Sequence, residues 1–279
     1  MSIVALIGDG TTTTSLAVAS GWPDTDPPLV MEADPSGGSL AAWLDTPALP
    51  SLATVVAQFT RPDDAAAAQT GRRTDVLAAL EPSIHRPPAG VAFVAAPTRS
   101  IAASRAVEEA ATVVFPALAA ADELTAIVDT GRHGSHLPRP PVLRHSDVIV
   151  ACHRQSAASA RAGAVRLERF AEQIVHWSTG GRALIPVVIG DEPFDPDEIG
   201  RFLVARSDGA PIHALHVLAD DPLAAAVLAG REGVSARRLQ RLPLMRSATE
   251  LSRRICDTVH EQRFGTRPAP RAHAGGVRR

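Results

Sequence analysis

Residues 3–38 read IVALIGDGTTTTSLAVASGWPDTDPPLVMEADPSGG. Residues 3–7 form a short apolar run, rich in β-branched side chains, that ends at Gly8-Asp9-Gly10; this composition predicts a buried strand followed by a tight turn. The hydroxyl side chains of residues 11–15 precede Leu16-Ala17-Val18-Ala19, which predicts a helix start. Strand, glycine turn and hydroxyl-rich helix start is the order of a phosphate-binding loop, in which backbone N–H groups and the helix dipole face an anion.

Two further strands are predicted to end in acidic residues. Residues 29–31 lead into Glu32-Ala33-Asp34-Pro35, and the apolar run 124–128 leads into Asp129-Thr130-Gly131. From Gly90 onward, strand and helix patterns alternate, which predicts a mostly parallel sheet with helices on both faces. The expected strands include 91–95, 183–189 and 212–218, and the expected helices include one opened by Asp195-Pro196 and a last one from Ser247 to about residue 263. We therefore expect a doubly wound α/β fold, with the acidic strand ends and the glycine turn at the same edge of the sheet.

These segments together resemble the ParA/MinD family of deviant-Walker ATPases, whose loop reads KGGVGKTT and whose second strand ends in D-x-D-P. The resemblance extends from residue 1 to about residue 263, weakly over 39–90, and implies a P-loop NTPase-like domain over 1–263. It also implies roles for individual residues. Nucleotide would contact Gly8, Asp9, Gly10, Thr11, Thr12, Thr13 and Gly190; Mg²⁺ would lie near Thr12, Glu32 and Asp129; and Asp34 would be the catalytic residue that positions the attacking water.

The sequence departs from the family at the two lysines of the loop. Thr11 replaces the phosphate-binding lysine and Leu6 the signature lysine, and the chain contains no lysine at all, since its 28 basic residues are all arginine. The first arginine is Arg61, whereas residues 1–60 contain six acidic side chains. A lysine about 4 Å from a phosphate contributes roughly 4 kcal/mol at an effective dielectric of about 20, or about three decades in affinity. We therefore predict that binding of ATP and Mg²⁺ is weak or absent.

Composition limits the remaining possibilities. The chain has 279 residues, 45% hydrophobic and 4% aromatic, with a formal net charge of −2, which predicts a globular protein without general affinity for nucleic acid or membranes. No apolar run reaches 18 residues, so no transmembrane segment is expected. Cys152 and Cys256 form no metal or disulfide pattern, and we expect a cytoplasmic location. Residues 264–279 are rich in Arg, Pro and Gly and are predicted to form a disordered tail.

Three functions remain open at this stage. The first is a pseudo-ATPase that scaffolds or regulates a protein partner in intracellular positioning, partition or secretion-apparatus assembly, as a homodimer or as a heterodimer with a ParA/MinD relative. The second is an active Mg-ATP-dependent ATPase dimer in which an arginine such as Arg99 or Arg132, or one from a second subunit, replaces the missing lysines. The third is a partition factor that contacts DNA through the tail over 264–279.

Overall fold

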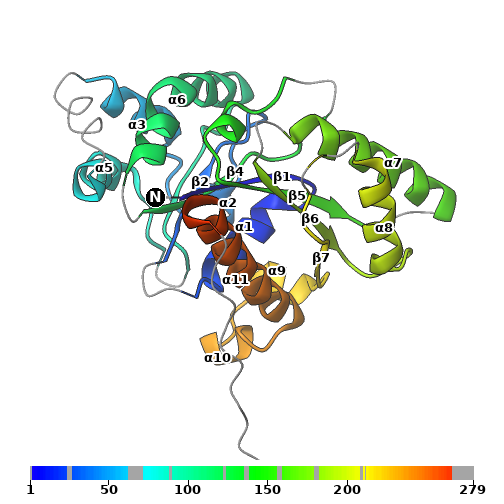
Figure 1. The fold of residues 1–279 in the computed structure, drawn as a ribbon. Helices are drawn as coiled ribbons and strands as arrows, with labels where there is room; N and C mark the ends of the chain where they lie inside the picture. The colour runs from blue at the N-terminus through cyan, green and yellow to red at the C-terminus, as the bar shows by residue number, and fades with distance from the viewer. Residues whose placement is uncertain are drawn as a thin grey trace, which may run out of the picture.

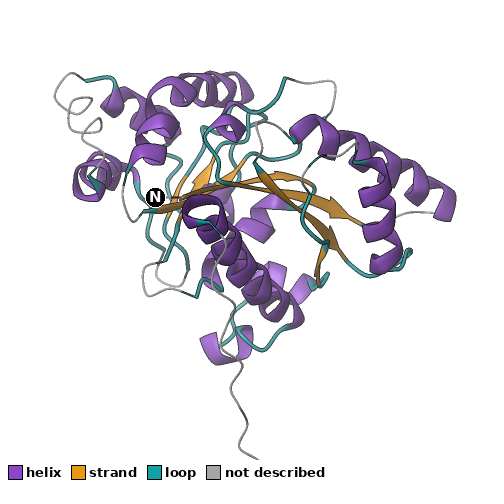
Figure 2. Ribbon diagram, in the orientation of Figure 1, coloured by secondary structure: helices purple, strands orange, loops and turns teal. Residues whose placement is uncertain are grey.

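The computed structural model describes residues 2–23, 27–61, 72–87, 90–121, 124–134, 138–155, 159–178, 182–207, 210 and 212–265 (Figures 1 and 2). Seven strands form one sheet in the order β3-β2-β4-β1-β5-β6-β7, and every ladder between neighbouring strands is parallel. The strands are β1 (Ser2–Gly8), β2 (Leu29–Glu32), β3 (Phe93–Val94), β4 (Thr125–Asp129), β5 (Val148–Arg154), β6 (Ala183–Ile189) and β7 (His216–Leu218).

Helices cover both faces of the sheet (Figure 2), because alternate side chains of each central strand point to opposite faces. In β1, Ile3, Ala5 and Ile7 belong to one apolar cluster, and Val4 and Leu6 to the other. The first cluster includes residues of α3 (Leu52–Phe59), α5 (Arg73–Leu80), α6 (Ser100–Ala120), α7 (Ala160–Trp177) and α8 (Pro196–Arg206). The second includes residues of α1 (Thr11–Ser20), α2 (Leu40–Trp43), α9 (Pro222–Leu228) and α11 (Pro243–Phe264), and Leu239 of α10 (Ala236–Leu239) packs against it. The doubly wound α/β architecture predicted from the sequence is thereby confirmed.

Several element boundaries differ from the sequence expectation. The last helix was expected from Ser247 but begins at Pro243, which the first turn of a helix accepts because proline lacks only an N–H that would have no partner there. The strand expected over 212–218 is reduced to His216–Leu218, with a separate bridge between Ile212 and Leu184. Of the predicted tail, residues 266–279 lie outside the described part of the chain. None of the helices described has the length and apolar character needed to cross a membrane.

The topology identifies one edge of the sheet as the place for a ligand. β1 lies between β4 and β5; the chain moves to the β2 side after β1 and to the β5 side after β4. In open α/β sheets, ligands bind beyond the carboxyl ends of the strands at such a reversal of strand order. The carboxyl ends of β1, β4 and β5 are therefore the structural starting point for the candidate site.

Candidate functional site at the carboxyl edge of the sheet

The connection between β1 and α1 consists of Asp9 and Gly10 alone. The Gly8 N–H donates to the Gly131 carbonyl (3.1 Å) and the Asp9 N–H to the Cys152 carbonyl (2.9 Å), so both groups bond neighbouring segments of the sheet edge. Gly8 has a φ of 114°, and a Cβ there would overlap the Cys152 carbonyl oxygen, which explains the glycine. A P-loop has four residues between its two glycines; here one residue separates Gly8 from Gly10.

The threonines after this turn form the first turn of α1. Gly10 is in the left-handed conformation at the N-cap, and its carbonyl accepts hydrogen bonds from the N–H (3.0 Å) and the hydroxyl (2.9 Å) of Thr14. Thr11 is buried, whereas Thr12 and Thr13 are half-buried. The threonines that sequence analysis assigned to nucleotide binding therefore lie together at a helix N-terminus.

Asp129, at the end of β4, is a fully buried carboxyl group. One of its oxygens accepts the Gly131 N–H (3.0 Å), and Oδ2 has no hydrogen-bond partner among the described residues. Burial raises the pKa of Asp129, and the nearby Asp34 carboxylate raises it further, while the hydroxyls of Thr11 and Thr12 lower it. The structure thus brings together Asp129 and Thr12, two of the three residues predicted to lie near Mg²⁺.

Glu32, the third residue predicted to lie near Mg²⁺, is also buried, but its oxygens are bound to the protein. Oε1 accepts hydrogen bonds from the Ser39 N–H (2.6 Å), the Ser39 hydroxyl (3.2 Å) and the Leu40 N–H (3.0 Å), and Oε2 accepts one from the Ala96 N–H (3.0 Å). Burial raises the pKa of Glu32, while these backbone donors lower it. The carboxylate therefore joins the N-terminus of α2 to the segment after β3. Its role as a magnesium ligand stays a prediction.

Asp34, predicted to be catalytic, is half-buried beside Gly131. Its Oδ1 accepts the Ser36 N–H at 2.7 Å, which shapes the turn after β2. Gly131 has a φ of 68°, and a Cβ at this position would overlap the Asp34 carboxylate. The loops after β2 and β4 are therefore in close contact at Asp34.

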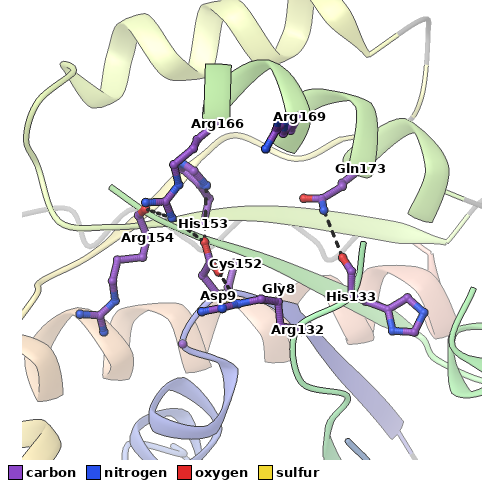
Figure 3. Close-up of a pocket in the computed structure, with 11 residues that line it drawn as sticks. Gly8, Asp9, Arg132, His133, Cys152, His153, Arg154, Arg166, Arg169 and Gln173 are labelled. Carbon is purple, nitrogen blue, oxygen red and sulfur yellow. Dashed lines mark hydrogen bonds and ion pairs between the residues drawn. The ribbon is translucent and has the colours of Figure 1, made fainter. Parts of the chain in front are cut away.

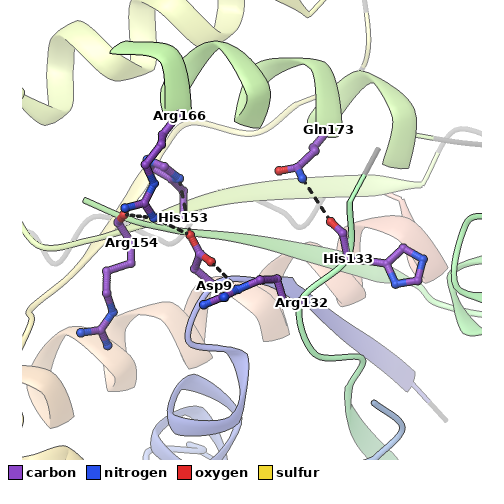
Figure 4. Close-up of polar contacts among 7 residues, drawn as sticks. All are labelled: Asp9, Arg132, His133, His153, Arg154, Arg166 and Gln173. Atoms are coloured by element: carbon purple, nitrogen blue, oxygen red, sulfur yellow. Dashed lines mark hydrogen bonds and ion pairs between the residues drawn. The ribbon is translucent and has the colours of Figure 1, made fainter. Parts of the chain in front are cut away.

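The side chain of Asp9 points away from α1 and toward two arginines (Figure 4). Its Oδ1 pairs with Nε of Arg132 at 2.9 Å, and its Oδ2 pairs with a terminal nitrogen of Arg166 at 3.0 Å. Nδ1 of His153 lies 3.9 Å from Oδ2. Burial lowers the pKa of His153 to about 4, so this ring is neutral at pH 7 and contributes no charge to the cluster.

A cavity of about 490 Å³ opens above this cluster, between the strand ends and α7 (Figure 3). Its lining is largely polar and comprises Gly8, Asp9, Gly10, Arg132, His133, Cys152, His153, Arg154, Arg166, Arg169 and Gln173. Sequence analysis did not identify Arg166 and Arg169. The available signal was their spacing of three on an amphipathic helix.

No protein-family model matches the sequence, and no curated protein matches it significantly. Solved structures do resemble the fold. A ParA family ATPase from Chlorobium tepidum matches with a TM-score of 0.56 at 13% identity, over 90% of this chain and 97% of that one. The MinC:MinD cell division protein complex of Aquifex aeolicus matches with a TM-score of 0.55 at 11% identity, over 92% of this chain and 96% of that one. This chain has a ParA/MinD-type P-loop ATPase fold.

The ParA/MinD-type fold extends to an enzyme of another kind. Cobyrinic acid a,c-diamide synthase from Mycobacterium smegmatis, solved with a bound ATP analogue and magnesium, matches with a TM-score of 0.55 at 13% identity, over 97% of this chain and 100% of that one. At such identities the similarity concerns the fold. The function of this chain must therefore be argued from its own residues.

The side of the sheet edge near Gly190, a predicted nucleotide contact, has little free space. Gly190, which directly follows β6, accepts a hydrogen bond from the side-chain amide of Gln155 (3.1 Å). Next to it, Arg154 donates two hydrogen bonds to the Asp220 carboxylate (3.0 and 3.1 Å). The hollow between Gly10, Thr13 and Asp220 measures about 10 Å³, close to the space that one water molecule requires.

Proposed function

We propose that this chain is a ParA/MinD-like pseudo-ATPase, a cytoplasmic binding protein that scaffolds or regulates a protein partner in intracellular positioning, partition or secretion-apparatus assembly. The fold supports the general role, and one structure that resembles it is a MinC:MinD complex, in which a protein partner is present. Association as a homodimer, or as a heterodimer with a ParA/MinD relative, belongs to the same proposal.

The observation that carries the proposal is the two-residue connection between β1 and α1. A phosphate-binding loop encircles phosphate oxygens with successive backbone N–H groups. Here the N–H groups of Gly8 and Asp9 bond neighbouring carbonyls, and too few residues remain to form such a ring. The Asp9 carboxylate at the turn is paired with Arg132 and Arg166, and the chain contains no lysine that could take the place of the loop lysine. The helix N-terminus alone supplies only about half a positive charge.

The magnesium side of the site supports the same conclusion. Glu32 is bound through four hydrogen bonds to Ser39, Leu40 and Ala96. With Glu32 bound by the protein and the loop shortened to two residues, the site does not fit the triphosphate of Mg-ATP, and we derive no phosphoryl-transfer step for this chain.

A second candidate, an active ATPase that uses arginine in place of lysine, is favoured by the position of Arg132 and Arg166 at the turn. Both guanidinium groups already bind Asp9, so a phosphate would have to compete with this carboxylate for them. Arg99, the other arginine considered, is the N-cap residue of α6, the helix that follows β3.

Calorimetric titration with Mg-ATP separates the two candidates. The pseudo-ATPase proposal predicts no magnesium-dependent heat of binding at millimolar nucleotide and no phosphate release above a buffer blank. A micromolar dissociation constant that is lost in Asp129→Ala, but retained in the exposed-site control Asp191→Ala, would instead establish the ATPase.

The DNA-contact prediction concerns residues 264–279, of which 266–279 lie outside the described residues. It is tested by DNA retention of the full chain and of a chain ending at residue 263. Retention that falls with salt and disappears on truncation would support a tail contact, whereas retention unchanged by truncation would exclude the tail as its cause.

A further inference from the structure

The cavity beneath α7 is lined by more arginine side chains than carboxylates among the described residues. Asp9 is the one acidic residue among the described residues of the lining, and it is shared by Arg132 and Arg166. Arg169 also lines the cavity, and it has no hydrogen bond or ion pair in the part of the chain that the structure describes. The fourth arginine, Arg154, is paired with Asp220 outside the lining. Among the described residues of the lining, these three guanidinium groups share one carboxylate, an excess of two positive charges.

Helix α7 presents the polar residues that it contributes to the cavity on one face. Arg166, Arg169 and Gln173 follow a spacing of three and four residues, which places them on one side of a helix, and they point toward the cavity (Figure 3). The adjacent side of α7 includes Phe170 and Ile174, which are buried in the apolar core, so the polar face has a fixed orientation. This arrangement is rigid enough to serve as a binding site.

The other walls of the cavity are also fixed by contacts. The side-chain amide of Gln173 donates to the His133 carbonyl (3.1 Å) and thereby ties α7 to the loop after β4. The His153 ring stacks on Phe170, with ring centroids 4.9 Å apart. The Arg166 guanidinium also donates to the Arg154 carbonyl (3.2 Å). The walls of the cavity and Arg166 are therefore held in place before any ligand arrives.

We propose that this cavity binds a small phosphorylated anion through Arg132, Arg166 and Arg169, with Asp9 as a built-in competitor. Guanidinium groups bind phosphate and carboxylate oxygens through paired N–H donors, and Asp9 already occupies two of these forks. The charge left uncompensated matches a dianion. The volume of about 490 Å³ lies within the range of small-molecule sites. This site uses side chains of α7 and does not depend on whether the chain binds ATP.

The test is a calorimetric titration of the full chain with sodium pyrophosphate, in magnesium-free buffer of low ionic strength. Arg169→Ala removes an exposed side chain that has no partner among the described residues, so we expect the fold to be retained. We expect it to weaken binding about tenfold, the contribution of one charge-assisted hydrogen bond. The matched control is Arg161→Ala, an exposed arginine of the same helix that does not line the cavity, and we expect a change of less than about twofold.

The Asp9→Asn variant distinguishes an anion site from a cluster of ion pairs that only stabilises the fold. It removes the competing charge and frees Arg132 and Arg166, so pyrophosphate binding becomes about tenfold tighter at equal ionic strength. Equal binding of pyrophosphate by wild type, Arg169→Ala and Arg161→Ala would show adventitious binding and overturn the proposal. The proposal would also be overturned if neither wild type nor Asp9→Asn bound pyrophosphate at about 10 mM, a concentration at which even a site with a millimolar dissociation constant would be occupied.

The same variants distinguish this inference from the proposed function. Magnesium-dependent ATP binding that is lost in Asp129→Ala and unchanged in Arg169→Ala would overturn the pseudo-ATPase proposal. Pyrophosphate binding that depends on Arg169 and is unchanged in Asp129→Ala would support the anion site, whatever the result with ATP.

Discussion

Replacing Asp129 with asparagine should stabilise this protein. Asp129 is fully buried; one oxygen accepts the Gly131 N–H, and Oδ2 has no partner among the described residues. Asparagine keeps an acceptor for Gly131 and places an uncharged amide donor where the hydroxyls of Thr11 and Thr12 can accept. A buried unsatisfied polar group costs about 1–3 kcal/mol. We therefore expect Asp129→Asn to raise the free energy of unfolding by about that amount, and Tm by about 2–4 °C per kcal/mol.

The stability difference between Asp129→Asn and wild type should also depend on pH. Burial raises the folded-state pKa of Asp129 above its ordinary value of 3.8. Protonation then favours the folded state, so the stability contribution of this group is complete below pH 3.8 and is lost as the pH rises through the folded pKa. The gap between Asp129→Asn and wild type, measured by urea unfolding, should therefore be smallest near pH 3.8 and widen as the pH rises toward neutrality.

Two comparison variants make the test specific. Glu32→Gln should destabilise by about 1.5–3 kcal/mol, because all four hydrogen bonds to its carboxylate use it as an acceptor and an amide retains one oxygen. The exposed Asp191→Asn should change stability by less than about 0.5 kcal/mol. A loss of about 1 kcal/mol or more in Asp129→Asn at pH 7, without added Mg²⁺, would refute the reasoning.

Three further predictions concern the backbone, the cluster and a helix cap. Gly131→Ala, with a φ of 68° and no room for a Cβ, should destabilise by about 2 kcal/mol or more, whereas Gly233→Ala, with nothing within 4 Å, should be nearly neutral in thermal unfolding. The His153 ring should titrate near pH 4 by NMR and its contribution to stability should fall as the pH drops from 6.5 toward 4; a midpoint above 6 would contradict its burial. Asp195→Ala should cost about 0.5–2 kcal/mol, because Asp195 caps α8 through two N–H groups, whereas Asp191→Ala should cost little.

Much of the fold could be predicted from local sequence patterns, such as apolar runs and helix-capping residues. The run 183–189 is apolar and ends at a glycine, and it forms β6 with the expected bounds. Asp195 before Pro196 predicted the start of α8, since an acidic cap and a proline in the first turn are both local signals. The length of edge strands depends on pairing with distant segments, and β3 accordingly retains two of the five residues expected over 91–95.

The site was less accessible to sequence reasoning. The turn at Gly8-Asp9-Gly10 and the position of Asp129 beside Thr12 follow from strand ends that meet in a parallel sheet. The pairing of Asp9 with Arg166 joins residues 157 positions apart, and no local signal specifies it. The sequence showed that lysine was missing from the loop, whereas the structure shows that the connection is also short and that its acid is bound to arginine.

The most direct test of the central claim is a crystal structure of the chain grown with Mg²⁺ and a non-hydrolysable ATP analogue. The account predicts no ordered triphosphate at the N-terminus of α1, with Asp9 still bound to Arg132 and Arg166. Ordered density for a γ-phosphate at that turn, with Asp9 displaced from the two arginines, would contradict it.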